Sequence, residues 1–269
     1  MCKGVKCFII AAVAICVIGC GADTSRREAA TGLVEQARSL IGEHRYDSAL
    51  VVLDTLDVKY RDCLEERREG TRVRLEALGA LTRDSLASAE LRLRAVNLTL
   101  DSLAPLFRKV EVPGTDGYFI DKAAYPSDDM NTTDVRIHVD EDGYCSLVAI
   151  VQGRKIGLQS VAYGDLVTPA KRSIVVENSE ILSLMQEQAA PMVEALCKAS
   201  GKVTLELIGK QGKVSVVLNA KQLEAIRNSW NYGMALQERR RLSIHLEKLE
   251  RQLAKVSDQL VNQTEYQED

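Results

Sequence analysis

Residues 86–110 read LASAELRLRAVNLTLDSLAPLFRKV, and this stretch decides the fold that we expect. Its apolar residues recur in alternating steps of three and four, the spacing of a helix that packs on another helix over several turns. They are Leu86, Ala89, Leu93, Val96, Leu100, Leu103, Phe107 and Val110. We therefore predict one long helix over residues 61–110, which Pro105 would kink or end.

A second stretch near the C-terminus repeats this alternation, with Leu242, Leu246, Leu249, Leu253, Val256 and Leu260. A long helix needs a partner to cover its apolar stripe. We expect residues 220–269 to return antiparallel to residues 61–110 as a coiled-coil stalk, with Glu90 near Arg241 and Leu75 near Val256. The alternative is that these seams pair between two chains and form a homodimer.

The N-terminal residues 1–19 have the parts of a secretory signal: two early lysines, an apolar run and a small residue before the cleavage point. The run, over residues 8–18, is shorter than the roughly 20 residues that a membrane span needs. Residues 17–20, Val-Ile-Gly-Cys, resemble the lipobox of bacterial lipoproteins. The resemblance implies cleavage before Cys20, diacylation of its thiol by fatty acids such as palmitate, and acylation of its new amine. An ordinary signal peptide and an uncleaved anchor are the alternatives.

A lipid on Cys20 would make the membrane a partner of the protein, because each buried CH₂ group contributes about 0.8 kcal/mol. We expect a lipid anchor in the outer or inner membrane of the cell envelope. Asp23 alone is not the acidic run that directs some lipoproteins to the cell surface, so the expected position faces the periplasm.

Residues 20–60 predict a tether and a short helical hairpin with a break at residues 42–45. Residues 45–50, Arg-Tyr-Asp-Ser-Ala-Leu, look like the turn and second-helix start of a tetratricopeptide repeat. Only one such unit is visible, whereas a stable array needs about three. A hairpin that pads the long helices is therefore favoured over a peptide-binding array.

Four short segments share the order aspartate, hydroxyl residue, then alanine or leucine. They are Asp47-Ser48-Ala49, Asp54-Thr55-Leu56, Asp84-Ser85-Leu86 and Asp101-Ser102-Leu103. The pattern resembles the O-glycosylation sequon of Bacteroidetes envelope proteins. The alternative is that these aspartates and hydroxyl residues only form the solvent-facing side of a helix.

Residues 111–219 predict a small, mostly antiparallel α+β head, inserted between the two long helices. The expected strands are 118–120, 135–139, 145–151, 156–163, 173–176, 203–208 and 214–218. Residues 135–139 alternate apolar and polar, which predicts a half-buried strand with His138 facing outward. A helix is expected from Asn178 or Ser179 to Lys198, interrupted by Pro191.

The head offers little chemistry, and we expect no enzyme, cofactor or metal site. None of the common catalytic motifs occurs in the sequence. The histidines, His44, His138 and His245, lie in three different segments, without the spacing of metal ligands. The acidic turn at residues 140–143 lacks most ligands of a calcium loop. A net charge of −3 gives no basic field for nucleic acid.

Three cysteines follow Cys20: Cys63, Cys145 and Cys197. Cys145 and Cys197 are the one pair that we consider for a disulfide, since an envelope compartment can oxidise thiols. The odd count and the absence of a spacing pattern favour free, buried thiols. The basic run Arg239-Arg240-Arg241 is interpreted as a solvated or salt-bridged helix face, with lipid headgroups as the alternative partner.

Residues 109–118 read KVEVPGTDGY, a type of entry into a β-rich head. With the lipobox and the C-terminal seam, it makes the chain resemble uncharacterised lipoproteins of Bacteroidetes that carry a β-rich head and a C-terminal coiled-coil helix. The resemblance implies this architecture and brings no activity with it.

These observations predict a membrane-anchored envelope lipoprotein with a non-catalytic structural or protein-interaction role and an envelope protein of unknown identity as partner. The alternative is a glycan- or peptide-binding lipoprotein with its site in residues 111–219. That alternative requires a cluster of exposed aromatic side chains in the head. The candidates are Tyr118, Phe119, Tyr125, Tyr144 and Tyr163.

Overall fold

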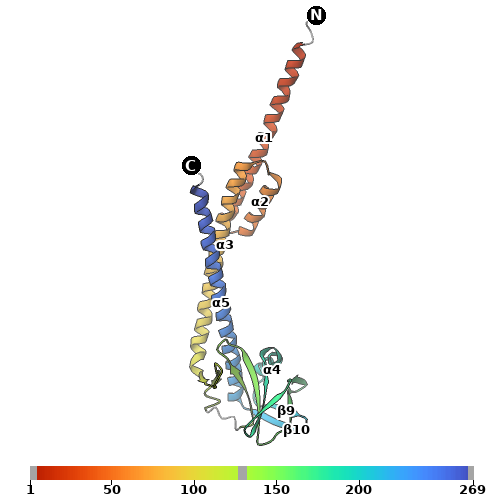
Figure 1. Cartoon of the computed structure of the whole chain (residues 1–269), viewed down its shortest axis with the longest axis vertical. Coiled ribbons are helices and arrows are strands. Elements are labelled where there is room, and N and C mark those ends of the chain that lie inside the picture. The colour runs from red at the N-terminus through yellow and green to blue at the C-terminus, as the bar shows by residue number, and fades with distance from the viewer. Residues whose placement is uncertain (1–4, 127–131, 266–269) are drawn as a thin grey trace. The chain divides into compact units, whose positions relative to one another are not determined.

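The computed structural model describes residues 5–126 and 132–265, and for residues 5–22 and 264–265 it describes the backbone alone. Within these residues the protein is α+β, with five α-helices, two antiparallel sheets and a long C-terminal helix (Figure 1). The chain forms two compact units, one of residues up to Glu90 together with those from His245, the other of Leu91–Ile244.

The helices are α1 (Val5–Gly42), α2 (Tyr46–Lys59), α3 (Leu64–Leu103), α4 (Gln186–Lys198) and α5 (Ala220–Glu265). The strands are β1 (Phe107–Val110), β2 (Tyr118–Asp121), β3 (Asp134–Val139), β4 (Cys145–Gln152), β5 (Leu158–Tyr163), β6 (Leu166–Pro169), β7 (Ser173–Val176), β8 (Ser179–Leu184), β9 (Val203–Gly209) and β10 (Gly212–Leu218). No helix in the described part of the chain combines the length and apolar character that crossing a membrane requires.

In the first unit, α1 and α2 meet at a tight break. His44 adopts φ 59°, and the Arg45 N–H donates to the Leu40 carbonyl at 2.8 Å. The core between the helices is small and aliphatic: Ala30, Val34, Ala37, Leu40, Ala49, Leu53, Leu56, Cys63 and Val73. Gly70 lies so close to α2 that a Cβ there would meet a Leu56 methyl at 2.5 Å, so a larger residue would force the buried Leu56 side chain to move.

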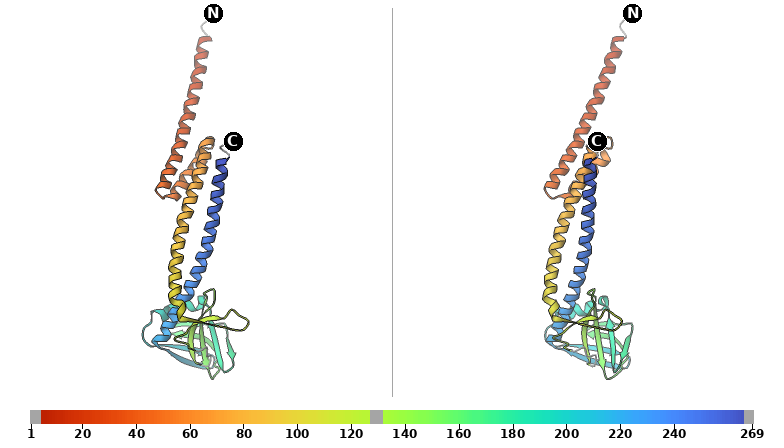
Figure 2. Two further views of the ribbon diagram at one scale, coloured as in Figure 1. Left: turned by 90° about the vertical axis from the view of Figure 1, so that its left-hand side faces the viewer. Right: turned by 60° about the vertical axis from the view of Figure 1, so that its left-hand side comes forward.

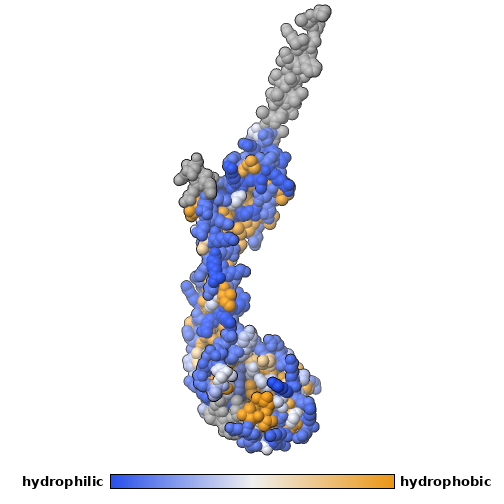
Figure 3. Space-filling model, in the orientation of Figure 1, coloured by the Kyte–Doolittle hydropathy of each residue, from blue (hydrophilic) through white to orange (hydrophobic). Residues whose placement is uncertain are grey.

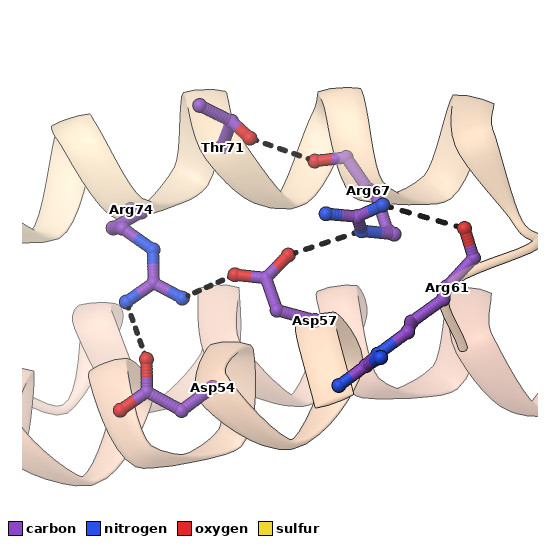
Figure 4. Close-up of polar contacts among 6 residues, drawn as sticks. All are labelled: Asp54, Asp57, Arg61, Arg67, Thr71 and Arg74. Carbon is purple, nitrogen blue, oxygen red and sulfur yellow. Dashed lines mark hydrogen bonds and ion pairs between the residues drawn. The ribbon is translucent and has the colours of Figure 1, made fainter. Parts of the chain in front are cut away.

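Ion pairs fix α3 across α2 on the solvent side of this core (Figure 4). Arg74 reaches two carboxylates of α2, Asp54 at 2.7 Å and Asp57 at 2.8 Å. Arg67 donates to the second oxygen of Asp57 at 3.3 Å and to the Arg61 carbonyl at 3.3 Å. A linked network of this kind holds its geometry better than an isolated surface pair.

In the second unit, the strands gather in one body, coloured green to cyan in Figure 2. One sheet has six strands in the order β1-β2-β3-β4-β8-β7, and the other has four in the order β10-β9-β5-β6. Both sheets, α4 and the start of α5 contribute to one apolar core, which includes Leu147, Leu182, Met192, Leu205 and Ile226.

Two elements differ from the sequence prediction because local signals were misleading. The predicted long helix ends early: α3 stops at Leu103, a 3₁₀ turn carries Pro105, and Phe107 and Val110 lie in β1. Proline cannot donate the helical hydrogen bond, and Phe107 instead stacks on Tyr232, with ring centroids 4.4 Å apart.

The helix expected from Asn178 or Ser179 is also wrong at its start. Ser179–Leu184 forms β8, and α4 begins only at Gln186. Leu182 and Leu184 are fully buried and point to the core with strand periodicity. A further strand, β6, was not predicted from the sequence. The C-terminal helix α5 begins at Ala220, where it was expected, and Asn219 and Gln222 exchange side-chain and backbone hydrogen bonds at 3.0 Å, a reciprocal cap.

Two glycines allow α5 to touch the turn between β3 and β4. A Cβ on Gly233 would meet the Cys145 sulfur at 2.3 Å and the Gly143 carbonyl oxygen at 2.5 Å. A Cβ on Gly143 would meet the Gly233 carbonyl oxygen at 2.4 Å. Backbone therefore packs on backbone here, and any larger residue on either side would force the two elements apart.

The seam residues that lie in helices are buried or half-buried. On α3, Ala89 and Leu100 are buried, and Leu86, Leu93, Val96 and Leu103 are half-buried. On α5, Leu242, Leu249 and Val256 are buried, and Leu246, Leu253 and Leu260 are half-buried. Within the second unit, Arg92 pairs with Glu238 at 2.8 Å. Within the first unit, Val256 lies against Gly79.

Candidate interaction surface

The outer face of the six-stranded sheet, opposite the shared core, has two unlike ends. At the end formed by β1, β2 and β3, side chains cover it. The Asp134 carboxylate pairs with the Arg136 guanidinium at 3.2 Å, and this guanidinium lies 4.8 Å from the centroid of the Tyr125 ring. The rings of Tyr118 and His138 stack 3.7 Å apart at 7°. We call this the covered end.

The polar groups of the covered end have perturbed acidities. Burial raises the pKa of Tyr125, and Asp134 adds to that effect. Burial raises the pKa of Asp134 more than Arg136 and its hydrogen bonds lower it. Burial, with help from the Arg136 charge, lowers the pKa of His138 to about 3, so this imidazole is neutral at physiological pH. His138 does lie on the outer face of the sheet, as expected, but it is half-buried under the Tyr118 ring rather than fully exposed.

At the other end, formed by β8 and β7, apolar side chains are bare. A row of isoleucines crosses the strands: Ile150 of β4 lies opposite Ile181 of β8, which lies opposite Ile174 of β7. Exposure rises along the row, from 0% at Ile150 to 53% at Ile174. On the same face, Val176 of β7 is 44% exposed, while Val175, which lies opposite Glu180 on the other face, is 47% exposed. We call this the bare end.

A shallow hollow of about 580 Å³ lies on the bare end, lined by Lys171, Arg172, Ile174, Ile181, Ser183, Met185, Glu187 and Gln188. It is open rather than enclosed, and apolar surface lies among charged groups over much of the molecule (Figure 3). A hollow of this form suits an extended chain or a flat protein surface better than a small molecule, which usually occupies a concave, largely enclosed pocket.

Among the four edge strands in the described residues, β7 has the least protection against pairing with another chain. β1 carries Arg108 and Lys109, β10 carries Lys213, and β6 ends in Pro169. Charges and prolines on an edge are the usual means of preventing strand addition. β7 reads Ser-Ile-Val-Val and has neither.

The bare edge is firmly held from the core side by Glu180 of β8, which is 2% exposed. Its carboxylate accepts hydrogen bonds from the N–H groups of Ile156, Gly157 and Leu158 at 2.7–3.1 Å, and from the Ser173 hydroxyl at 2.5 Å. Desolvation raises the pKa of Glu180, but these donors outweigh it and hold the pKa below its ordinary value. Glu180 thus links Ser173 of β7 to the backbone of residues 156–158.

The exposed aromatic cluster that the ligand-binding alternative requires is not found. Tyr125 is buried at 7%, Tyr118, Phe119 and Tyr163 are half-buried, and Tyr144 is exposed. Phe119 packs edge-on against Tyr232. The aromatic side chains of this unit thus mainly fill its interior.

The acidic turn at residues 140–143 is a hairpin turn. The Gly143 N–H donates to the Asp140 carbonyl at 3.1 Å, and the Tyr144 N–H donates to the Asp140 side chain at 2.8 Å. Asp142 pairs with Arg240, and Arg241 pairs with Glu238 at 2.6 Å, so the basic run of α5 is a salt-bridged helix face as predicted.

Other expected residues lie apart. Cys63, Cys145 and Cys197 are all free, and the first two are buried. His44 lies in the first unit, where its Nδ1 is 2.7 Å from the Tyr46 hydroxyl. The part of the chain with described side chains holds no group of three or more histidine, cysteine, aspartate or glutamate residues placed to bind a metal.

The hydroxyl residues of the four aspartate-containing segments all lie on helices. Thr55, Ser85 and Ser102 donate to backbone carbonyls within one turn, at 2.7–3.1 Å. Cys20 lies within α1, but its side chain is outside the described residues.

Sequence reasoning found β7 as a strand but missed its importance. The signal was present: an uncharged apolar strand stands between the basic pair Lys171-Arg172 and the acidic Glu177. Glu180 was missed because a lone glutamate in a sequence does not reveal that three backbone N–H groups converge on it.

Comparison with known proteins brings no relative into view: no protein-family model, no curated protein and no solved structure matches this chain.

Proposed function

We propose that the protein is a membrane-anchored envelope lipoprotein with a non-catalytic role, in which paired long helices carry a head that contacts other protein. The observation that carries the protein-contact role is the exposed, charge-free edge strand β7. The anchor rests on the sequence of residues 17–20 and on the signal before it.

The stalk is part of this proposal, and two contacts support an antiparallel pairing of α3 with α5. Arg92 pairs with Glu238, which is close to the expected approach of Glu90 and Arg241. Gly79 lies next to Val256, about one helical turn from the expected Leu75. Because these contacts lie within one chain and the seam residues are already buried or half-buried there, in-chain pairing is favoured over a homodimer formed through the seams.

The ligand-binding alternative has less support, because the aromatic side chains of the head are largely covered. The bare end of the sheet instead offers an open apolar surface beside an unprotected edge, the arrangement used for strand addition. The partner in the envelope is therefore expected to be a protein.

Metabolic labelling tests the anchor. Cells that express the full chain are fed an alkyne fatty acid, and the protein is probed after click coupling to a dye. We expect labelling and membrane fractionation of the wild type, and loss of both in Cys20→Ala. Cys16→Ala is the matched control, since that cysteine lies inside the apolar run and should leave labelling unchanged. An unlabelled wild type, or labelled Cys20→Ala, would refute the lipid anchor.

A further inference from the structure

We infer that the β7 edge pairs with the β7 edge of a second copy of this chain, antiparallel and about a two-fold axis. The inference deepens the protein-contact role proposed above and rests on it, but it does not depend on the lipid anchor. It would join two six-stranded sheets edge to edge in an isologous interface, which is the commonest form of homodimer.

Backbone geometry fixes which residues of β7 can bind outward. Residues 177 and 178 form a two-residue turn, and Val176 lies opposite Ser179. Such a turn is closed by hydrogen bonds between its flanking residues, and hydrogen-bonded pairs alternate with non-bonded pairs along an antiparallel ladder. Val176 and Ile174 therefore direct their N–H and C=O groups toward β8, whereas Ser173 and Val175 direct theirs to the open edge.

One antiparallel register uses all of these outward groups. When Ile174 lies opposite Ile174 of the second copy, Ser173 lies opposite Val175 of the second copy, and the reverse. Each of the two pairs exchanges two backbone hydrogen bonds, so the four outward groups on each edge are satisfied. Moving the two-fold axis to Val175 would place Ser173 opposite the turn of the second copy, so fewer backbone hydrogen bonds would form between the two chains.

The same register continues the apolar row. Directly opposite residues of a sheet lie on the same face, so Ile174 would extend the series Ile150–Ile181–Ile174 into its mirror series on the second copy. The exposed end of the row would be covered. Val176 would lie over the aliphatic stem of Arg172 from the other chain.

Charge complementarity specifies a copy of this chain rather than another protein. In this register Lys171 lies opposite Glu177 of the second copy, and the two-fold axis makes the contact twice. Lys171 and Arg172 precede β7 and Glu177 follows it. In an antiparallel pair of identical strands, the basic end of each strand therefore lies beside the acidic end of the other. A parallel arrangement would instead place like charges side by side.

Cysteine crosslinking of the full chain tests the register. Ile174→Cys would place two thiols in a non-hydrogen-bonded pair, where Cα atoms lie about 4.5 Å apart, within the range of a disulfide. Val217→Cys is the matched control, because Val217 is 55% exposed on the edge strand β10. Under mild oxidation of purified, solubilised protein, we expect a disulfide-linked band of twice the chain mass for Ile174→Cys only.

The wild type controls for the native cysteines, of which Cys197 is partly accessible. Dimer formation no greater for Ile174→Cys than for Val217→Cys would overturn the inference. The oxidation of Ile174→Cys is repeated in native membranes to distinguish a second copy from another partner. A disulfide-linked product of a mass other than twice the chain mass would show that a different protein pairs with β7, and would overturn the inference. Because solubilised protein is used first, failure of the lipid anchor cannot cause failure of this test.

Charge reversal gives an independent test without a new covalent bond. Lys171→Glu or Glu177→Lys alone would set two like-charged pairs across the axis, and we expect the dimer to weaken about tenfold in analytical ultracentrifugation. A mixture of the two variants restores opposite charges at both contacts, so mixed dimers should form about as well as the wild type. Failure of the mixture to recover would refute the proposed register.

Discussion

The covered and bare ends of one sheet face differ in what the chain places over them. At the covered end, residues that precede β3 in the chain, Tyr118 and Tyr125, fold back over His138 and Arg136. At the bare end, Ile181 is half-buried and Ile174 is 53% exposed. Side chains on the same face of the sheet are thus buried at one end and exposed at the other. What packs over them decides this, rather than the sequence of the strand itself.

The largest expected effect separates the two ends along the isoleucine row. Ile150→Lys would bury an unpaired charge at a position that is 0% exposed, and we expect it to lower the free energy of unfolding by about 5 kcal/mol. Ile174→Lys, two strands away in the same row, should change it by less than about 0.5 kcal/mol in the monomer. Urea denaturation at a concentration where the chain is monomeric measures both. Equal losses of unfolding free energy in the two variants would show that Ile174 is as buried as Ile150.

A smaller effect is expected at the carboxylate that holds the bare edge from inside. Glu180→Gln removes the charge and turns an amide toward N–H donors, so we expect a loss of about 3 kcal/mol. Glu206→Gln is the control, since Glu206 pairs with Lys213 at the surface at 3.0 Å and should cost less than about 0.5 kcal/mol. Thermal and urea denaturation at neutral pH would compare the two. If Glu180→Gln lowers the free energy of unfolding no more than the control does, the hydrogen bonds of the Glu180 carboxylate do not stabilise the fold as expected.

The smallest expected effect concerns the covered end and depends on pH. The pKa of His138 is lowered to about 3 in the folded protein, against about 6.5 for an ordinary histidine. The unfolded chain therefore binds a proton first as pH falls, and the stability that neutral His138 contributes above about pH 6.5 is lost progressively toward pH 3. Between about pH 7 and pH 5 the wild type should lose about 2 kcal/mol more than His138→Phe.

Phenylalanine is the suitable replacement because it keeps the stack on Tyr118 and removes a buried ring nitrogen, Nε2, that has no hydrogen-bond partner among the described residues. Urea denaturation across the pH range gives the comparison. Parallel stability curves for the two proteins would mean that His138 titrates normally and that the covered end is open to water.

Several elements were predictable because local rules settle them. The alternation of three and four identified helix positions that are buried or half-buried on α3 and α5. Glycine-containing turns marked the strand pairs β3–β4 and β9–β10, which are joined by residues 140–144 and 210–211. The start of the C-terminal helix was expected at residue 220, and α5 begins at Ala220. In each case the deciding residues lie within a few positions of one another.

Other elements were not predictable because their causes are distant in sequence. Ser179–Leu184 resembles a capped helix start until Leu182 and Leu184 meet the core and Glu180 meets Ile156–Leu158. Phe107 continued the helical spacing, but stacking on Tyr232, far along the chain, draws it into a strand. Tertiary packing outweighs local preference at these points.

The sequence by itself determined the fold class, because helical seams with a β-rich segment between them predict an α+β protein. These features depend on periodicity and on near neighbours. The lipoprotein signal stays a prediction. Only the tertiary structure decided which strands lie at sheet edges, that Arg136 is buried and His138 half-buried, and that Ile174–Val176 is exposed. Strand order brings together residues from remote positions, and the free energy of burial depends on those neighbours rather than on the strand's own sequence.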